Sequence, residues 1–267
     1  MKYKMIFSDM DGTLLKDDYE VSQGNRDAIE KAVAMGTSFV VCTGRGAFGV
    51  VEVLKQMNLM GKEGYAICQN GGTVYNLKNM ELEIRHGFSS SILLPVAKRV
   101  RELALEIYYY DDFRFMAEKE TARVRKYCAV MSTEMHLLKE PTDYDGSFTK
   151  CLITGPREKL LALRKEISYL EETEIDIFFS SPIFMEIVKK GVNKGRAMAE
   201  IAEKVGVSLD EVIAVGDGDN DIPMIRCAGL GIAVANAEDE VKAVAKHITK
   251  RRYDEDAIAE VIEEFIL

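Results

Sequence analysis

Two short segments rich in aspartate are the parts of this chain best suited to chemistry. Asp9 and Asp11 stand two residues apart after an apolar run, and the segment 216–221 places three acids and an amide after another. Residues i and i+2 of an extended chain point to the same side, so the first two carboxylates would share one face. Carboxylates at close range repel one another unless a cation or a shared proton lies between them. Because oxygen ligands without Cys or His suit a hard cation, the two segments predict a Mg²⁺ site.

Each segment also has a simpler interpretation. The turn at residues 11–12 could be an ordinary Asp-Gly turn whose acids are solvated. The spacing of Asp217, Asp219 and Asp221 begins like a calcium loop of the EF-hand type. Ile222 stands where that loop needs glycine, and no glutamate occupies its last ligand position, which argues against the EF-hand.

Two further segments could bind an anion. Thr43 and Gly44 follow a third apolar run, where a hydroxyl and exposed backbone N–H groups can cradle a phosphate. A plain strand-to-helix turn is the alternative there. Lys194 opens an expected helix, although a cation at a helix N-terminus opposes the helix dipole. That position is understandable if Lys194 faces an anion; without the other segments, a solvated lysine would be the better interpretation.

Alternating strands and helices must position these segments. The alternation predicts right-handed crossovers and a Rossmann-like, doubly wound parallel sheet, which is an α/β fold. Both aspartate segments would then lie at the carboxyl ends of strands, where ligands bind in such folds. Strands are expected at 3–8, 38–42, 65–68, 212–215 and 231–234, and helices at 22–36, 50–57, 193–205, 222–228, 238–246 and 255–265.

The middle of the chain has a different pattern and predicts an inserted α+β domain. We expect this insertion at 83–186, with the α/β core formed by 1–82 and 187–267. Strand-like runs occur at 107–110, 114–117, 148–154, 175–179 and 184–188, and helical runs at 94–105, 121–131 and 157–170.

Composition and charge exclude several classes of protein. The 267 residues carry 35 basic and 44 acidic side chains, a net charge of −9, and neither expected domain is basic, which argues against nucleic-acid binding. No apolar run approaches the ~20 residues that cross a bilayer. The apolar start is too short for a signal peptide, so we expect a cytoplasmic protein. Five cysteines without a Cys-x-x-Cys pair indicate buried thiols and neither a disulfide framework nor a zinc site.

Taken together, these segments resemble the haloacid dehalogenase superfamily of aspartyl-phosphate phosphohydrolases. The resemblance rests on residues 9–13, 43–45, Lys194 and 216–221, in that order and in those positions relative to strands and helices. The inserted α+β domain is similar to the large cap of the Cof-type branch, and Asn70-Gly71 looks like the Asn-Gly element that precedes that cap. The resemblance covers essentially the whole chain.

The resemblance implies a role for each matching residue. Asp9 would be the nucleophile that attacks phosphorus. Asp11 would be the general acid and base, for which a partly buried, acidic setting would keep it protonated at neutral pH. Mg²⁺ would be held by Asp9, the backbone carbonyl of Asp11, Asp217 and Asp221. The phosphoryl oxygens would be bound by Thr43, Gly44, Lys194, Asn220 and the backbone N–H of Met10, and the substrate would also be touched by Arg45 and Asn193.

The resemblance further implies a Mg²⁺-dependent phosphatase of small phosphorylated metabolites. Sugar phosphates are the first expectation, and phosphorylated cofactors such as flavin mononucleotide or pyridoxal phosphate are the second. Asp11 favours phosphotransfer over dehalogenation, because the dehalogenases of this superfamily lack the second aspartate. A phosphomutase that uses the same aspartates remains an alternative, and so does a non-catalytic phosphate-responsive binding protein.

The inserted domain would close over the core as a cap. Tyr108, Tyr109, Tyr110 and Phe113 are candidates for a specificity surface there, and ordinary strand packing is an equally good interpretation. We expect a monomer or a small homo-oligomer.

Overall fold

The computed structural model describes residues 2–267, which form two compact units. The inserted unit contains Arg45–Gly49 and Ile84–Val192, and all other described residues belong to the core unit. The insertion therefore runs to Val192, beyond the expected 83–186. It also includes Arg45–Gly49, which the sequence pattern assigned to the core.

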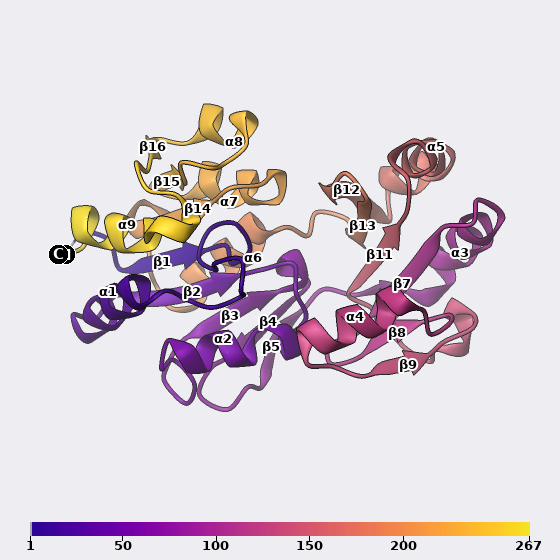
Figure 1. Cartoon of the computed structure of the whole chain (residues 1–267), viewed down its shortest axis with the longest axis horizontal. Coiled ribbons are helices and arrows are strands. Elements are labelled where there is room, and N and C mark those ends of the chain that lie inside the picture. The colour runs from indigo at the N-terminus through magenta and orange to yellow at the C-terminus, as the bar shows by residue number, and fades with distance from the viewer. Residues whose placement is uncertain (1) are drawn as a thin grey trace. The chain divides into compact units, whose positions relative to one another are not determined.

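One mixed sheet forms the centre of the core unit (Figure 1). Within the described residues its strand order is β16-β15-β14-β1-β2-β3-β4-β5, and the neighbours from β16 to β3 are parallel. β4 is antiparallel to β3, so the predicted doubly wound parallel sheet is confirmed with an antiparallel extension at one edge. The strands are β1 (Met5–Ser8), β2 (Ser38–Cys42), β3 (Tyr65–Cys68), β4 (Thr73–Asn76), β5 (Leu82–Arg85), β14 (Val212–Gly216), β15 (Leu230–Ala233) and β16 (His247–Ile248).

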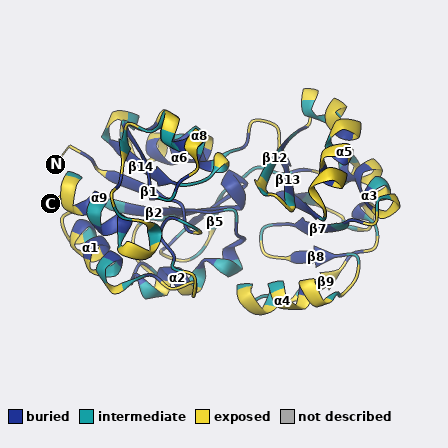
Figure 2. Cartoon of the chain, turned by 45° about the horizontal axis from the view of Figure 1, so that its top comes forward, coloured by how far each residue is buried: buried dark blue, intermediate teal, exposed yellow. Residues whose placement is uncertain are grey.

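Helices cover both faces of this sheet. They are α1 (Gln23–Ala34), α2 (Val51–Gln56), α6 (Lys194–Lys204), α7 (Ile222–Cys227), α8 (Asp239–Val244) and α9 (Ala257–Phe265). α1 packs against α9, and α6 packs against α7. The two pairs lie on opposite faces, because the right-handed crossovers from β1 to β2 and from β14 to β15 run in opposite directions along the sheet. The central strands β1, β14 and β15 are buried along their length (Figure 2).

Local sequence signals explain where two of these helices begin and end. Ser22 caps α1, and its hydroxyl accepts a hydrogen bond from the backbone N–H of Asn25 at 3.2 Å. Gly36 and Gly206 follow α1 and α6 with φ of 94° and 72°, the left-handed conformation that ends helices.

The inserted unit has its own six-stranded sheet in the order β12-β13-β11-β7-β8-β9. Its remaining strands, β6 (Phe88–Ser89) and β10 (Ser147–Phe148), pair with each other. The six strands are β7 (Glu106–Tyr110), β8 (Phe115–Ala117), β9 (Met135–Leu137), β11 (Lys150–Thr154), β12 (Ile175–Ser181) and β13 (Phe184–Lys189).

The two faces of the inserted sheet carry different cores. One face packs against α3 (Leu93–Glu102) and α5 (Arg157–Ile167) in a large apolar cluster that includes Tyr109 and Ile153. The other face carries a smaller cluster with Tyr108 and Tyr110, which packs with residues of α4 (Ala122–Met131). The mixed α+β character expected for the insertion is confirmed.

The sequence pattern missed β4, β5, β6, β9 and β16, and it merged Phe148 of β10 with β11 in the single expected run at 148–154. The expected helix at 157–170 continues past α5 only as the short 3-10 turn at Ser168–Glu172. The cysteines are all free thiols, and Cys42, Cys68 and Cys151 are buried as expected, whereas Cys227 is exposed. Among residues 2–267, no helix is both long and apolar enough to span a membrane.

The substitution Gly195→Ala should destabilise the core unit, although alanine normally favours a helix interior over glycine by about 1 kcal/mol. A Cβ at Gly195 would lie 2.6 Å from backbone atoms of Pro223, so α6 and α7 would have to move apart. We expect the free energy of unfolding in urea to fall by about 1–3 kcal/mol.

Gly24 of α1 is the matched control, because the atoms nearest to a Cβ there belong to the carboxylate of Asp256, whose side chain can rotate away. Gly24→Ala should leave the free energy of unfolding unchanged or raise it by up to about 1 kcal/mol. Equal losses in the two variants would show that the close approach of α6 and α7 is not the reason for Gly195.

Candidate active site

The two aspartate segments come together where the strand order of the core sheet reverses. β1 and β14 are adjacent, with Ser8 opposite Val215, and the chain continues from β1 to β2 but from β14 to β15. Asp9 directly follows β1, and its backbone N–H donates to the carbonyl of Val215 at 2.9 Å. Reversals of this kind, at the carboxyl ends of strands, are where ligands bind in open α/β sheets.

The carboxylates of Asp9, Asp217 and Asp221 form one group in which an oxygen of each lies within 4.8 Å of the others. The carboxylate of Asp217 accepts a hydrogen bond from Thr13 Oγ1 at 2.8 Å. The buried carboxylate of Asp221 accepts backbone hydrogen bonds from Asp217 at 2.9 Å and from Gly218 at 3.1 Å. Three oxygen donors at this separation fit one hard cation such as Mg²⁺.

Lys194 places a buried ammonium group against two of these carboxylates. Its Nζ lies 2.5 Å from Asp9 Oδ1 and 2.6 Å from Asp221 Oδ1. Burial alone would lower the pKa of Lys194, but Asp221 and Asp9 outweigh burial and raise it, so the ammonium stays charged. The lysine at this helix start does face anions, as its unusual position suggested. Three carboxylates and one ammonium leave two negative charges, which a divalent cation would balance.

Burial shapes the acidity of the carboxylates themselves. It raises the pKa of Asp9 well above the usual range against the opposing effect of Lys194, and neighbouring carboxylates add to the rise. Burial also raises the pKa of Asp217 to about 6, with a further contribution from Asp221. Carboxylates in this setting ionise more readily when additional positive charge is nearby.

Asp11 lies outside this carboxylate group. Its side chain is exposed, whereas that of Asp9 is buried, so the partly buried setting expected for Asp11 is wrong. The extended strand ends at Ser8, and the chain then turns through Gly12, whose φ is 85°. The carbonyl of the buried Met10 closes this turn by accepting hydrogen bonds from the N–H groups of the three residues Thr13, Leu14 and Leu15.

The other segments expected to bind phosphate meet around Asn70. Thr43 is buried at the end of β2, and its carbonyl accepts a hydrogen bond from the backbone N–H of Asn70 at 2.9 Å. Asn220 Nδ2 donates to Asn70 Oδ1 at 3.0 Å. A Cβ on Gly44 would lie 3.2 Å from Asn70 Nδ2, so the Asn70 amide lies against Gly44.

The two residues expected to touch the substrate have structural roles of their own. Arg45 belongs to the inserted unit, where it is buried and its Nη1 donates to the carbonyl of Gly49 at 3.4 Å. Asn193 is the N-cap of α6, and its side-chain oxygen accepts a hydrogen bond from the backbone N–H of Arg196 at 2.9 Å. The Asn193 cap therefore fixes the helix start that carries Lys194.

Tyr108, Tyr109 and Tyr110 pack in the apolar cores of the inserted unit. Tyr109 stacks on Phe148 with ring centroids 5.1 Å apart, inside the larger core of the inserted unit. Tyr108 and Tyr110 are buried in the smaller cluster on the opposite face of the sheet. Phe113 is 62% exposed and does not take part in either core.

Two polar side chains that sequence analysis gave no role support the site. The hydroxyl of Thr13 holds Asp217. Asn236 Nδ2 donates to the carbonyl of Gly12 at 2.8 Å, and its Oδ1 accepts from the backbone N–H of Tyr253 at 3.0 Å. Asn236 stands shortly after the apolar strand β15, which is the same signal that marked the aspartates and could have identified it.

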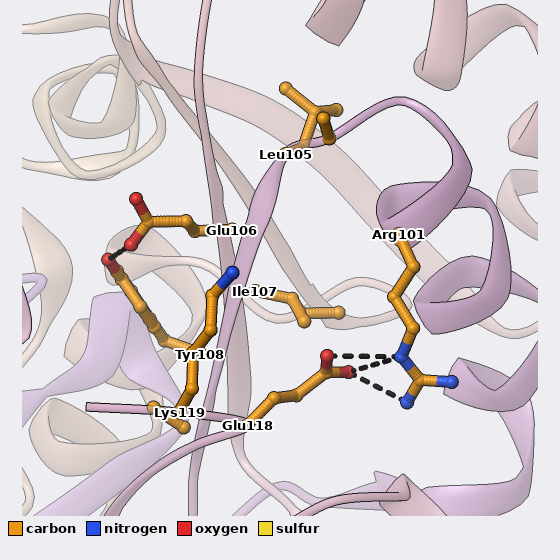
Figure 3. A pocket seen from close by; sticks show the side chains of 9 residues that line it. Arg101, Leu105, Glu106, Ile107, Tyr108, Glu118 and Lys119 are labelled. Atoms are coloured by element: carbon orange, nitrogen blue, oxygen red, sulfur yellow. Dashed lines mark hydrogen bonds and ion pairs between the residues drawn. The ribbon is translucent and has the colours of Figure 1, made fainter. Parts of the chain in front are cut away.

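A groove of about 380 Å³ lies within the inserted unit, at the end of the sheet where β7 begins (Figure 3). Arg101 in its wall forms an ion pair with Glu118 at 2.8 Å, and Tyr108 Oη donates to Glu106 at 2.6 Å. These contacts pair four of the polar groups in the groove with one another, and Lys119 also lines it.

Comparisons with known proteins agree with this geometry. The family model described as haloacid dehalogenase-like hydrolase matches residues 6–262. The chain is 31% identical to YxeH of Bacillus subtilis (strain 168) over 268 residues, which cover 99% of each protein. It is 31% identical over 266 residues to 5-amino-6-(5-phospho-D-ribitylamino)uracil phosphatase YcsE of the same organism, covering 99% of this chain and 96% of YcsE.

A solved structure extends the agreement to the fold. The crystal structure of a haloacid dehalogenase-like hydrolase from Bacteroides thetaiotaomicron superposes with a TM-score of 0.89 at 31% identity, over 99% of this chain and 100% of that chain. The family match contains all four motif segments and runs through both units. The chain therefore belongs to the haloacid dehalogenase-like hydrolase family, as the motifs suggested, and it is a phosphatase within that family.

Proposed function

We propose that this protein hydrolyses phosphate monoesters of small metabolites in a Mg²⁺-dependent reaction, through an aspartyl-phosphate formed on Asp9. The observation that carries the proposal is the setting of Asp9. Its buried carboxylate lies at the end of β1, in contact with Lys194 and beside Asp217 and Asp221. A carboxylate fixed by an ammonium group at the ligand-binding edge of the sheet is suited to attack phosphorus.

The donor set supports Mg²⁺ as the cofactor. Asp9, Asp217 and Asp221 would hold the ion, together with the backbone carbonyl of Asp11. The two net negative charges of this group and Lys194 favour a divalent cation. When bound, the ion neutralises negative charge on the nucleophile and the phosphoryl group, which would otherwise repel each other.

The remaining chemistry belongs to the chain's own side chains. A carboxylate oxygen of Asp9 forms a bond to phosphorus while the bond from phosphorus to the ester oxygen breaks, and Asp11 would give a proton to that leaving oxygen. Because the Asp11 side chain is exposed, bound substrate must supply the covered setting in which it holds that proton. Water then gives a proton to Asp11 and attacks the phosphorus, which frees Asp9 and releases inorganic phosphate. Thr43, Gly44, Lys194, Asn220 and the backbone N–H of Met10 hold the phosphoryl oxygens throughout.

We infer that the substrates are phosphate esters of sugars or of sugar-derived chains, with phosphorylated cofactors as the second class. The similarity to YcsE, whose name gives a 5-phospho-D-ribitylamino compound as its substrate, favours a phosphorylated polyol chain. The inserted unit would select the substrate as a cap, with Arg45 and Asn193 in contact with it. The free cysteines and acidic charge agree with a cytoplasmic enzyme, which we expect to be a monomer or a small homo-oligomer.

Asp9→Asn should abolish Mg²⁺-dependent release of phosphate from p-nitrophenyl phosphate. An amide oxygen cannot replace the carboxylate as nucleophile, so kcat/KM should fall by about 10³-fold or more, equivalent to about 4 kcal/mol or more of transition-state stabilisation. The measurement is the initial rate of nitrophenol release, with circular dichroism to verify the fold.

Asp219→Asn is the matched control, because Asp219 lies in the same aspartate-rich loop but is exposed and outside the carboxylate group. It should retain kcat/KM within about twofold. Robust turnover by Asp9→Asn would contradict the assignment of the nucleophile.

Added Mg²⁺ should raise the melting temperature of the wild-type protein, because an ion that binds only the folded state stabilises that state. At about a hundredfold excess over Kd, the gain would be about 2.7 kcal/mol. Asp217→Asn removes one negative charge from the carboxylate group and should reduce this rise in melting temperature. KCl at equal ionic strength should not raise the melting temperature of the wild type in the same way. Equal shifts in the wild type and Asp217→Asn would speak against this site.

A further inference from the structure

The loop between β3 and β4 has an unusual backbone. Gln69, Asn70 and Gly71 have φ of 52°, 56° and 97°, three consecutive residues in the left-handed region. Glycine adopts this conformation freely and asparagine tolerates it, but glutamine does so rarely. Strained backbone of this kind persists only where surrounding contacts hold it, and it concentrates at functional sites.

Asn70 is held by contacts with the two segments that we expect to bind the phosphoryl group. Its backbone N–H donates to the carbonyl of Thr43 at 2.9 Å, and its amide lies against Gly44. Its side-chain oxygen accepts a 3.0 Å hydrogen bond from Asn220 Nδ2. Asn70 is 2% exposed, so water does not compete with these hydrogen bonds.

The same loop also contacts the segment that carries Lys194. A Cβ on Gly71 would lie 2.4 Å from the carbonyl oxygen of Asn193 and 3.3 Å from Cβ of Ala197. Gly71 therefore lets the loop pack directly on the first turn of α6. One strained loop thus touches the ends of three separate elements that supply Thr43, Lys194 and Asn220.

We propose that Asn70 is a positioning residue for phosphoryl transfer, acting through Asn220. The amide nitrogen of Asn220 carries two hydrogens. Donating one of them to Asn70 fixes the orientation of the amide, so that the second is directed to a phosphoryl oxygen. The left-handed backbone of residues 69–71 directs the Asn70 side chain toward Asn220. The backbone N–H of Asn70 at the same time donates to the carbonyl of Thr43. This inference rests on the proposed phosphatase function.

The first test is Asn70→Gly in the full-length protein with Mg²⁺. Glycine adopts the left-handed backbone at no cost, so the fold should be kept while the amide is lost. We expect kcat/KM for p-nitrophenyl phosphate to fall about 10- to 100-fold, mainly through kcat, because a misplaced donor weakens the transition state. The melting temperature should stay within a few degrees of wild type.

Asn58→Gly is the matched control. Asn58 is another left-handed asparagine of the core unit, with φ of 53°, but it is exposed and follows α2. It should leave kcat/KM within about twofold of wild type. A similar loss in both variants would assign the effect to backbone freedom and overturn the proposal.

A double-mutant cycle with Asn220→Ala tests whether the two amides act together. If Asn70 acts through Asn220, then adding Asn70→Gly to Asn220→Ala should cause little further loss of kcat/KM. Additive losses, or an Asn70→Gly variant with wild-type kinetics, would overturn the proposal. An Asn70→Gly variant that fails to fold would also overturn it, because the role would then be structural. Absence of phosphatase activity in the wild type would instead contradict the proposed function itself.

Discussion

The rest of the site depends on the buried ion pairs that the ammonium group of Lys194 forms with Asp9 and Asp221. Lys194 lies in the first turn of α6, where the helix dipole disfavours a cation, and it has lost its contact with water. Asp9 and Asp221, both within 2.6 Å, offset these costs. The buried lysine is therefore stable only with its carboxylates, and it in turn restrains the carboxylate of Asp9.

The topology of the core unit explains how residues far apart in sequence come to meet this ammonium. The strand order reverses at β1, so the loops after β1 and β14 lie side by side. The close approach of α6 to α7 at Gly195 brings the start of α6 to the same edge, and the Asn193 cap fixes that start. The left-handed loop at residues 69–71 then connects this helix start to Thr43 and Asn220. Each contact restrains a different part of one site.

The meeting of the aspartates could be predicted from the sequence more completely than the architecture around them. Asp9 and Asp217 each follow an apolar run that predicts a parallel strand. The carboxyl ends of such strands lie at one edge of the sheet, so the two carboxylates were expected to meet there. The exposed side chain of Asp11 could not be predicted, because the extended spacing ends where Gly12 turns the chain. The missed strands lack the run of three or more apolar residues that marked the equally short β1, β3 and β8. The assignment of Arg45–Gly49 to the inserted unit depends on contacts distant in sequence.

The most direct test of this account is to look for the phosphoryl group on Asp9. Enzyme mixed with substrate and Mg²⁺ would be quenched in acid within one turnover, digested, and analysed by mass spectrometry. If Asp9 is the nucleophile, the peptide that contains Asp9 gains the mass of one phosphoryl group, and this gain is lost in Asp9→Asn. Turnover without such a peptide, or a phosphoryl group on another residue, would contradict Asp9 as the nucleophile.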